Sequence, residues 1–380
     1  MLELSGRTLG EFILREQIGG GGYGAVYRGE QPSLEREVVI KVLREERGDG
    51  DSRERFLREA RLAAQLRHPY AAQVYAFGAA DDGSLLWIAM ERVQGVSLSD
   101  WLEHHGPMPL ERFVPFFDRV CEVVHAAHER GIVHRDLKPS NIMVIECGDR
   151  LIPKLLDLGI AKGSRRTEIA PDADADADQG RDSGGDGAKT ERLPVRPRRA
   201  RRTVGCYDSE RRRQLTPPGS TLGSSPYMAP EQWGGADVVG PEADVYALGV
   251  VAYQSLTGRL PFVADRADDY FDHHQRAPVP RLGDGFPRDL DPAIRGALDK
   301  HPLNRTSSAL ELARDLWRAL RTSKREQLRA SAQQWLDECC PTSLLWGADM
   351  LEEALRSVPQ EALSDLECLF LKTSQRRIRR

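Results

Sequence analysis

The chain lacks long apolar runs and the cysteine patterns that bind metals or form disulfide frameworks. Nowhere in its 380 residues do about 20 consecutive apolar residues occur, so no membrane-spanning helix is expected. The N-terminus has no basic flank leading into an apolar stretch, and the six cysteines are scattered. These absences predict a soluble protein of the reducing cytoplasm.

An excess of charge of one sign is also missing. The net charge of −4 argues neither for nucleic acid nor for an anionic membrane as a partner. Lysine is scarce, with 8 residues against 46 arginines. The hydrophobic content of 40% and charged content of 29% are typical of a globular protein, and the length allows roughly two to three domains.

Apolar patterns divide the chain into two unlike parts. Residues 11–95 carry short strand-like runs broken by glycine, with one helical segment at 51–66. From residue 97 onward helical patterns dominate, as at 110–131 and 242–258. A small β-rich part followed by a larger helical part predicts an α+β fold of two lobes, with a ligand site between them.

Three stretches carry chemistry suited to phosphate. IGGGGYGAV at 18–26 is glycine-rich, and glycines let a hairpin lie over a polyphosphate with its amides pointing inward; a plain flexible hairpin is the alternative. VVIKVL places Lys41 on one face of a strand, and Glu59 follows in the helical segment, where the two can pair. Both charges can equally belong to solvated faces.

The third stretch is GIVHRDLKPSNIMV at 131–144. Asp136 can accept a hydroxyl proton, and Asn141, five residues later, can hold a metal. PKLLDLGIAK then places Asp157 after an apolar run, as a second metal ligand. Phosphoryl transfer needs a glycine lid, a cation, two metal-binding groups and a base, because positioning and charge neutralisation do most of its catalysis.

Together these stretches resemble the eukaryotic-type (Hanks-type) serine/threonine protein kinases of bacteria. The resemblance runs from about residue 10 to about residue 320 and includes SSPYMAPEQ, DVYALG and KHPLNR. It implies a kinase domain at 11–320 after a lead-in at 1–10, with an N-lobe at 11–95 and a C-lobe at 96–320. Lys138, two residues after Asp136, resembles the serine/threonine class, which implies Ser/Thr side chains of proteins as substrates.

The resemblance also implies how ATP is bound. Lys41 would bind the α- and β-phosphates and pair with Glu59. Met90 would be the gatekeeper, and the backbone of Glu91 to Val93 would be the hinge that meets adenine. The phosphates would be covered by the glycine loop, Ile18, Gly19, Gly20, Gly21, Gly22, Tyr23, Gly24, Ala25 and Val26.

The resemblance also implies the catalytic residues and the residues that stabilise the C-lobe. Asp136 would act as base and Lys138 would stabilise the transferred phosphate, while Asn141 and Asp157 would hold Mg²⁺, with Mn²⁺ as a substitute. Glu231 would pair with Arg305, and Asp244 would tie back to the catalytic loop. Some positions depart from the commonest family residues without removing a catalytic group: Val39, Leu158, Ser224 and Ser225. An active signalling kinase is therefore predicted, and a nucleotide-binding pseudokinase scaffold acting through its C-terminal helices is the alternative.

The activation segment is unusually long, since 74 positions separate Asp157 from Glu231. An acidic run, PDADADADQG, and a basic one, RPRRARR, fall in an insertion at about 163–222, whose composition predicts disorder. The insertion is either a tolerated loop without a role or an autoregulatory one, in which Arg135 would bind a phosphate on the segment. Candidate acceptors are Thr203, Thr216, Ser220 and Thr221, with Thr216 favoured.

Two expectations about partners follow. A second copy of the chain would be a partner, as a homodimer, if the segment is phosphorylated in trans. The arginine runs also suggest a nucleic-acid contact, but the neighbouring aspartates compete for them and no aromatic residues interleave for base stacking. Nucleic acid is therefore not expected as a partner.

Beyond residue 320 the resemblance ends, and two or three short amphipathic helices are predicted over 321–380. Ser323 and Glu326 have the spacing of a capping box, which predicts a helix start there. This extension either packs against the large lobe or serves as a docking or dimerisation element.

Overall fold

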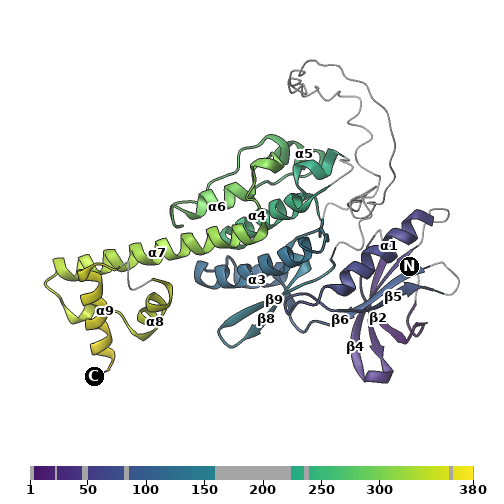
Figure 1. Cartoon of the computed structure of the whole chain (residues 1–380), viewed down its shortest axis with the longest axis horizontal. Coiled ribbons are helices and arrows are strands. Elements are labelled where there is room, and N and C mark those ends of the chain that lie inside the picture. The colour runs from purple at the N-terminus through teal and green to yellow at the C-terminus, as the bar shows by residue number, and fades with distance from the viewer. Residues whose placement is uncertain are drawn as a thin grey trace, which may run out of the picture.

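The first lobe is a curled antiparallel sheet flanked by a helix (Figure 1). The computed structural model describes residues 4–21, 24–44, 50–80, 85–158, 224–234, 239–358 and 363–379. The strand order is β1-β2-β3-β4-β6-β5. The elements are β1 (Thr8–Leu9), β2 (Phe12–Gly21), β3 (Gly24–Gln31), β4 (Arg36–Arg44), α1 (Gly50–Gln65), β5 (Val74–Ala79) and β6 (Leu85–Glu91), with a 3₁₀ turn η1 (Pro32–Leu34).

Alternation along β4 decides which way Lys41 points. The even-numbered residues are buried in a small core within the first lobe: Val38, Ile40 and Val42. Val39 and Leu43 face the other way and pack against the main core of the molecule. Because successive side chains of a strand alternate between faces, Lys41 points with Val39 and Leu43 out of the small core. Leu9, from the predicted lead-in, is buried in the small core.

The second lobe is mostly helical and is built around α4, which is apolar on every side. Nearly every α4 residue from Ala243 to Leu256 is buried, as expected for a central helix. A Cβ on Gly249 would lie 3.0 Å from side-chain atoms of Ala297 and Leu298, so glycine allows the close packing of α4 on α6. The helices are α2 (Leu98–His105), α3 (Leu110–His128), α4 (Pro241–Thr257), α5 (Ala267–Arg276) and α6 (Leu290–Ala297).

A small sheet and several short turns complete this lobe. The sheet pairs β7 (Val96–Ser97), β8 (Ile142–Cys147) and β9 (Arg150–Leu155) in that order, and β8 and β9 frame the segment that leads to Asp157. The 3₁₀ turns are η2 (Pro139–Asn141), η4 (Ser225–Tyr227), η5 (Pro230–Gly234) and η6 (Pro302–Asn304). The predicted insertion at 163–222, with its candidate acceptors, lies outside the described residues.

One long helix, α7 (Ala309–Asp337), crosses the predicted domain end at residue 320 without a break. Its N-cap is Ser308, whose side chain accepts a hydrogen bond from the Glu311 backbone N–H at 3.2 Å. The predicted helix start at Ser323 is wrong, because Ser323 and Glu326 lie inside α7, where the backbone N–H groups already have helical partners.

The far end of α7 carries a core of its own, separate from the small core of the first lobe and from the main core. A turn, η7 (Thr342–Leu344), leads to α8 (Ala348–Ser357) and α9 (Asp365–Ile378), and both helices pack on the second half of α7 and on each other (Figure 1). We call residues 328–379 the C-terminal module. Its core includes Leu328, Trp335, Trp346, Leu351 and Phe370. Every helix in the described part of the chain is too short or too polar to cross a membrane.

Candidate active site

The predicted glycine loop is the β2–β3 hairpin. Gly21 pairs with Gly24, and Val26 lies opposite Lys41 in the neighbouring strand. A Cβ on Gly24 would stand 2.1 Å from the carbonyl oxygen of Val42, so no larger residue fits there. Gly22 and Tyr23, at the tip, lie outside the described residues. The sheet therefore places the loop directly beside Lys41.

Lys41 reaches the second lobe, where its Nζ lies 3.1 Å from Oδ2 of Asp157. Asp157 follows β9, and its backbone is left-handed, with φ of 52°. Both side chains are largely buried, 20% and 32% exposed. The structure thus brings together the predicted phosphate-binding cation and a predicted metal ligand.

Glu59 has a different partner from the one expected. Its Oε1 lies 3.6 Å from Nη1 of Arg135, and the predicted Lys41–Glu59 pair is not formed. Burial raises the pKa of the Glu59 carboxyl, although the Arg135 guanidinium opposes the shift. In this arrangement each of the two carboxylates, Asp157 and Glu59, holds its own cation.

The predicted base Asp136 lies in a small network of polar side chains. Its Oδ2 is 3.0 Å from Nζ of Lys138, and Lys138 also donates to Oγ of Ser224 at 3.0 Å. Asn141 donates through Nδ2 to the Asp136 carbonyl at 2.8 Å and to its Oδ2 at 3.3 Å. Ser224 was noted in the sequence only for its hydroxyl; its contact joins residues 86 positions apart.

Two histidines that the sequence analysis left without a role hold this loop. His134 is buried; its Nδ1 accepts from the Asp136 N–H at 3.3 Å, so its Nε2–H donates to the Leu156 carbonyl at 2.9 Å. His128 donates through Nε2 to Oδ2 of Asp244 at 2.8 Å. The loop backbone before Asp136 is thereby tied to the residue before Asp157.

Asp244 ties back to the catalytic loop as predicted from the resemblance. Its carboxylate accepts the backbone N–H groups of His134 at 2.7 Å and Arg135 at 2.8 Å. Burial alone would raise the pKa of Asp244, but the hydrogen bond and charge of His128 and the His134 N–H outweigh it and lower the pKa. The carboxylate therefore stays ionised and fixes the loop.

The hinge is anchored by a residue that sequence reasoning missed. Met90 is buried at the end of β6, and Val93 is half-buried. Both carboxylate oxygens of Glu91 accept from Nζ of Lys154, at 2.7 and 2.8 Å, and one also accepts the Gln73 N–H. Lys154 lies on β9, so the hinge is tied to the strand that leads to Asp157.

Glu231 and Arg305 form the predicted pair, and it is bidentate. Nη1 and Nη2 of Arg305 donate to Oε1 and Oε2 of Glu231 at 2.6 and 2.7 Å. The Arg305 side chain is 0% exposed, and its guanidinium lies 4.9 Å from the centre of the Tyr246 ring. The pair fixes the segment before α4 to the body of the second lobe.

Comparison with known proteins agrees with this geometry. The protein kinase domain family matches residues 12–174 and 208–338. The chain belongs to this family. The unmatched stretch, 175–207, falls inside the predicted insertion. Solved structures of the PknI kinase domain from Mycobacterium tuberculosis share the fold, with a TM-score of 0.56 and 25% identity over 83% of the chain and 98% of that domain. The predicted two-lobed kinase fold is confirmed.

Curated relatives of this kinase domain are bacterial serine/threonine-protein kinases. The chain is 33% identical over 313 residues to PknB of Mycobacterium tuberculosis, covering 81% of the chain and 42% of PknB. It is 34% identical over 319 residues to pkn3 of Myxococcus xanthus, covering 81% and 50%. It is 29% identical over 332 residues to PrkC of Bacillus subtilis, covering 86% and 43%. The chain spans half or less of the length of these relatives.

The residues of the kinase domain fit a magnesium ion. The Leu156 N–H donates to the Asn141 carbonyl at 2.9 Å, which brings Asn141 alongside Asp157. One carboxylate and one amide oxygen, completed by phosphates and water, is a ligand set typical of Mg²⁺. Among the described residues, no group of three or more His, Cys, Asp and Glu is placed to hold a metal alone. The site thus suits a metal whose remaining ligands come from the phosphate groups of a bound nucleotide and from water.

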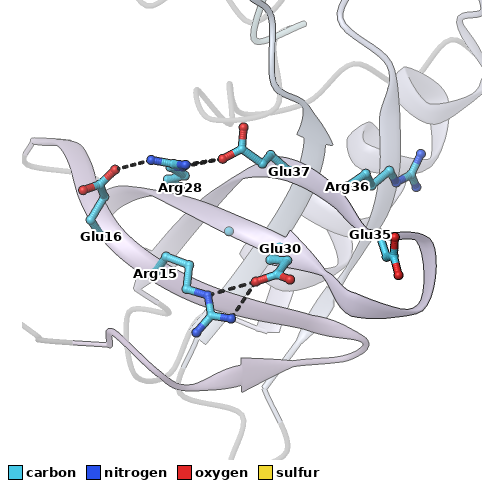
Figure 2. Close-up of a pocket in the computed structure, with 8 residues that line it drawn as sticks. Arg15, Glu16, Arg28, Glu30, Glu35, Arg36 and Glu37 are labelled. Atoms are coloured by element: carbon cyan, nitrogen blue, oxygen red, sulfur yellow. Dashed lines mark hydrogen bonds and ion pairs between the residues drawn. The ribbon is translucent and has the colours of Figure 1, made fainter.

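A depression of about 450 Å³ lies on the first lobe, lined by residues of β2, β3 and β4 and of the turn between β3 and β4 (Figure 2). Arg28 pairs there with Glu16 at 3.0 Å and with Glu37, while Arg15 pairs with Glu30 at 2.6 Å. These side chains are 40–62% exposed, and both of these arginines have a carboxylate partner. Exposed pairs of this kind contribute little to stability, and the depression holds none of the phosphoryl-transfer groups.

Proposed function

We propose that the chain is an ATP-dependent kinase that phosphorylates serine and threonine side chains of proteins, its own activation segment included. The observation that carries the proposal is the Asp136–Lys138–Asn141 network, set beside the Lys41–Asp157 pair. Every group that phosphoryl transfer requires is present, and no observation favours a pseudokinase. Cytoplasmic signalling is the setting we expect.

The reaction follows from the placement of these groups. The substrate hydroxyl attacks the γ-phosphorus of ATP, the bond from that phosphorus to the bridging oxygen breaks, and ADP leaves. Asp136 accepts the hydroxyl proton, and Lys138, 3.0 Å from it, neutralises charge on the transferred phosphoryl group. Asn141 and Asp157 would hold Mg²⁺, which, when bound, screens the charge of the phosphates.

Phosphate binding requires two pairs to change partners. Lys41 must leave Asp157 for the ATP phosphates, which frees Asp157 for the metal. Glu59 must leave Arg135 for Lys41, and Arg135 then binds a phosphate on the activation segment in place of the Glu59 carboxylate. Since a phosphate carries about two negative charges, it competes well with one carboxylate for Arg135. This gives the expected phosphorylation, at Thr216 in particular, a route to the active site.

The test is to incubate the full chain with labelled ATP and Mg²⁺, beside an Asp136→Asn variant, and to map the phosphorylated residues. We expect label on Ser or Thr, including residues 203–221, and a loss of at least 100-fold in the variant with ATP binding retained. Chelation should abolish transfer, and Mn²⁺ should restore part of it. ATP binding without any transfer by the wild-type chain would instead establish a pseudokinase.

A further inference from the structure

Gln232, in η5, joins the end of the activation segment to the catalytic loop. Its Oε1 accepts the backbone N–H of Ala229 at 2.8 Å, and its Nε2 donates to the carbonyl oxygen of Arg135 at 3.1 Å. The residue follows Glu231 directly and is half-buried. One side-chain amide therefore links the segment 224–234, which we call the substrate platform, to the residue before Asp136.

The orientation of this amide is fixed by its partners. The Ala229 N–H can only donate and the Arg135 carbonyl can only accept. A rotated amide would set donor against donor and acceptor against acceptor, so both bonds exist in one orientation alone. A side chain at this position must carry an acceptor for the Ala229 N–H and a donor for the Arg135 carbonyl at its end. The glutamine amide carries both.

The hydrogen bond from Gln232 reaches the catalytic loop at Arg135, a residue with a strained backbone. Arg135 has φ of 61°, in the left-handed region that side chains disfavour. The Asp244 carboxylate holds its N–H at 2.8 Å. The next peptide, from Arg135 to Asp136, is held at its nitrogen by His134 at 3.3 Å and at its oxygen by Gln232. Gln232 thus provides the shorter of the two bonds on the peptide that carries Asp136.

We propose that Gln232 is a positioning residue, which orients Asp136 according to whether the substrate platform is in place. The inference rests on the proposed function, because it assigns Gln232 a part in that same transfer. Its consequence is that losing the bond slows the chemical step and leaves the binding of both substrates largely intact.

The chain offers a matched control in Gln275 of α5. Its Nε2 donates to the carbonyl oxygen of Pro230 at 2.9 Å, so it holds the same platform. Within the part of the chain that the structure describes, the Gln275 side chain makes no hydrogen bond to residues 134–141, and it is also half-buried. Replacing it removes a platform bond of the same chemistry without touching the loop.

The experiment compares Gln232→Leu, Gln232→Glu and Gln275→Leu in the full chain. The Gln232→Glu side chain still accepts from Ala229 but sets an oxygen against the Arg135 carbonyl. For both Gln232 variants we expect kcat to fall at least tenfold, with the KM for ATP and for a casein substrate within threefold. For Gln275→Leu we expect kcat within twofold and a higher KM for casein. Unchanged kcat at position 232, or an equal loss at position 275, overturns the proposal.

Hydrogen exchange separates this proposal from the proposed function. Backbone amides at 133–137 should exchange at least tenfold faster in both Gln232 variants than in the wild-type chain and Gln275→Leu. A wild-type chain that transfers no phosphate refutes the proposed function, yet the exchange rates still test the link. Equal exchange in all four proteins overturns the inference, whether or not the wild-type chain is active.

Discussion

Buried charge is concentrated in a few residues of the second lobe. The surroundings of each charged residue decide how much it contributes to the free energy of unfolding. Arg305 is enclosed and bonded to Glu231, to the Asp299 and Glu242 carbonyls, and to an aromatic face. Arg318, on α7, pairs with Asp315 at 2.7 Å but is 65% exposed. The two arginines form similar contacts in unlike environments.

Arg305→Ala should lower the free energy of unfolding by about 3–5 kcal/mol, because it leaves the Glu231 carboxylate buried without its cation. Arg318→Ala should change it by less than about 0.5 kcal/mol, since water solvates both ends of that pair. Urea unfolding of both variants checks this. Equal losses would mean that the Glu231–Arg305 pair contributes no more than a surface pair.

His274, on α5, makes stability depend on pH. Burial, and then the charge of Lys300, lowers the pKa of His274 to about 3, and its Nδ1 is hydrogen-bonded with the Tyr246 hydroxyl at 2.8 Å. The unfolded chain binds a proton near pH 6.5, so it holds more protons than the folded chain between about pH 6.5 and pH 3. Stability therefore falls as pH falls through this window.

When the pH is lowered from 7 to 5, His274 should reduce the free energy of unfolding of the wild-type chain by about 2 kcal/mol. Below pH 6.5 the slope approaches about 1.4 kcal/mol per pH unit. A His274→Gln variant should lack that part of the slope, whatever its stability at pH 7. Urea unfolding at both pH values measures the difference. The same slope in both proteins would show that His274 does not titrate in this way.

At the scale of elements, the sequence pattern S-x-x-E occurs at three places with different outcomes. Ser308 caps α7 and Ser364 caps α9, where its side chain and that of Glu367 form a full capping box. Ser323 has the same spacing but lies inside α7, since the apolar face of that helix continues from Leu320 to Leu328. The local spacing of Ser and Glu indicates possible helix starts, and the packing of distant residues determines which of them form.

Ser308→Ala should therefore cost about 1 kcal/mol of unfolding free energy, the usual value for losing an N-cap. Ser323→Ala should be neutral or stabilise by up to about 0.5 kcal/mol, because alanine is the better helix former. Thermal or urea unfolding of the two variants gives the comparison. A cost at Ser323 as large as at Ser308 would contradict the continuous helix.

The active site shows the same division between local and distant contacts. Asp136, Lys138 and Asn141 lie within six residues, so the motif predicted their grouping from the sequence. The partners of Glu59, Glu91 and Arg135 come from distant segments. The sequence indicated Arg135 only as a phosphate-binding residue and not as the partner of Glu59, and no local pattern pointed to Lys154 or Gln232. The fold class was predictable from the order of patterns, whereas the pairing of Lys41 with Asp157 in place of Glu59 depends on how the two lobes and α1 are arranged in space.

The described part of the chain contains three cores, and one helix, α7, joins the core of the C-terminal module to the two cores of the lobes. The main core runs through both lobes, while the core of the C-terminal module is separate. Phe370 is 0% exposed and meets the rings of Trp335 and Trp346 edge-on, at 5.7 and 5.4 Å. Leu369, next to it, is 52% exposed.

Phe370→Ala should destabilise the module by about 3–5 kcal/mol and leave the kinase core intact. Hydrogen exchange in α8 and α9 should then accelerate, while exchange in α3 and α4 stays as in the wild-type chain. Leu369→Ala, the control, should change neither. Faster exchange in α4 of the Phe370 variant would show that the core of the module and the main core unfold together.

Helix α7 holds the C-terminal module at a distance from the body of the second lobe. At 1.5 Å per residue its 29 residues extend about 44 Å. Lys324 pairs with Glu111 of α3 at 2.8 Å and anchors the helix near its middle. The 13 residues beyond that anchor reach about 20 Å, so a 10° tilt there moves the tip by about 3.5 Å. The same helix thus contacts both the module and α3, the helix whose His128 holds the catalytic loop through Asp244.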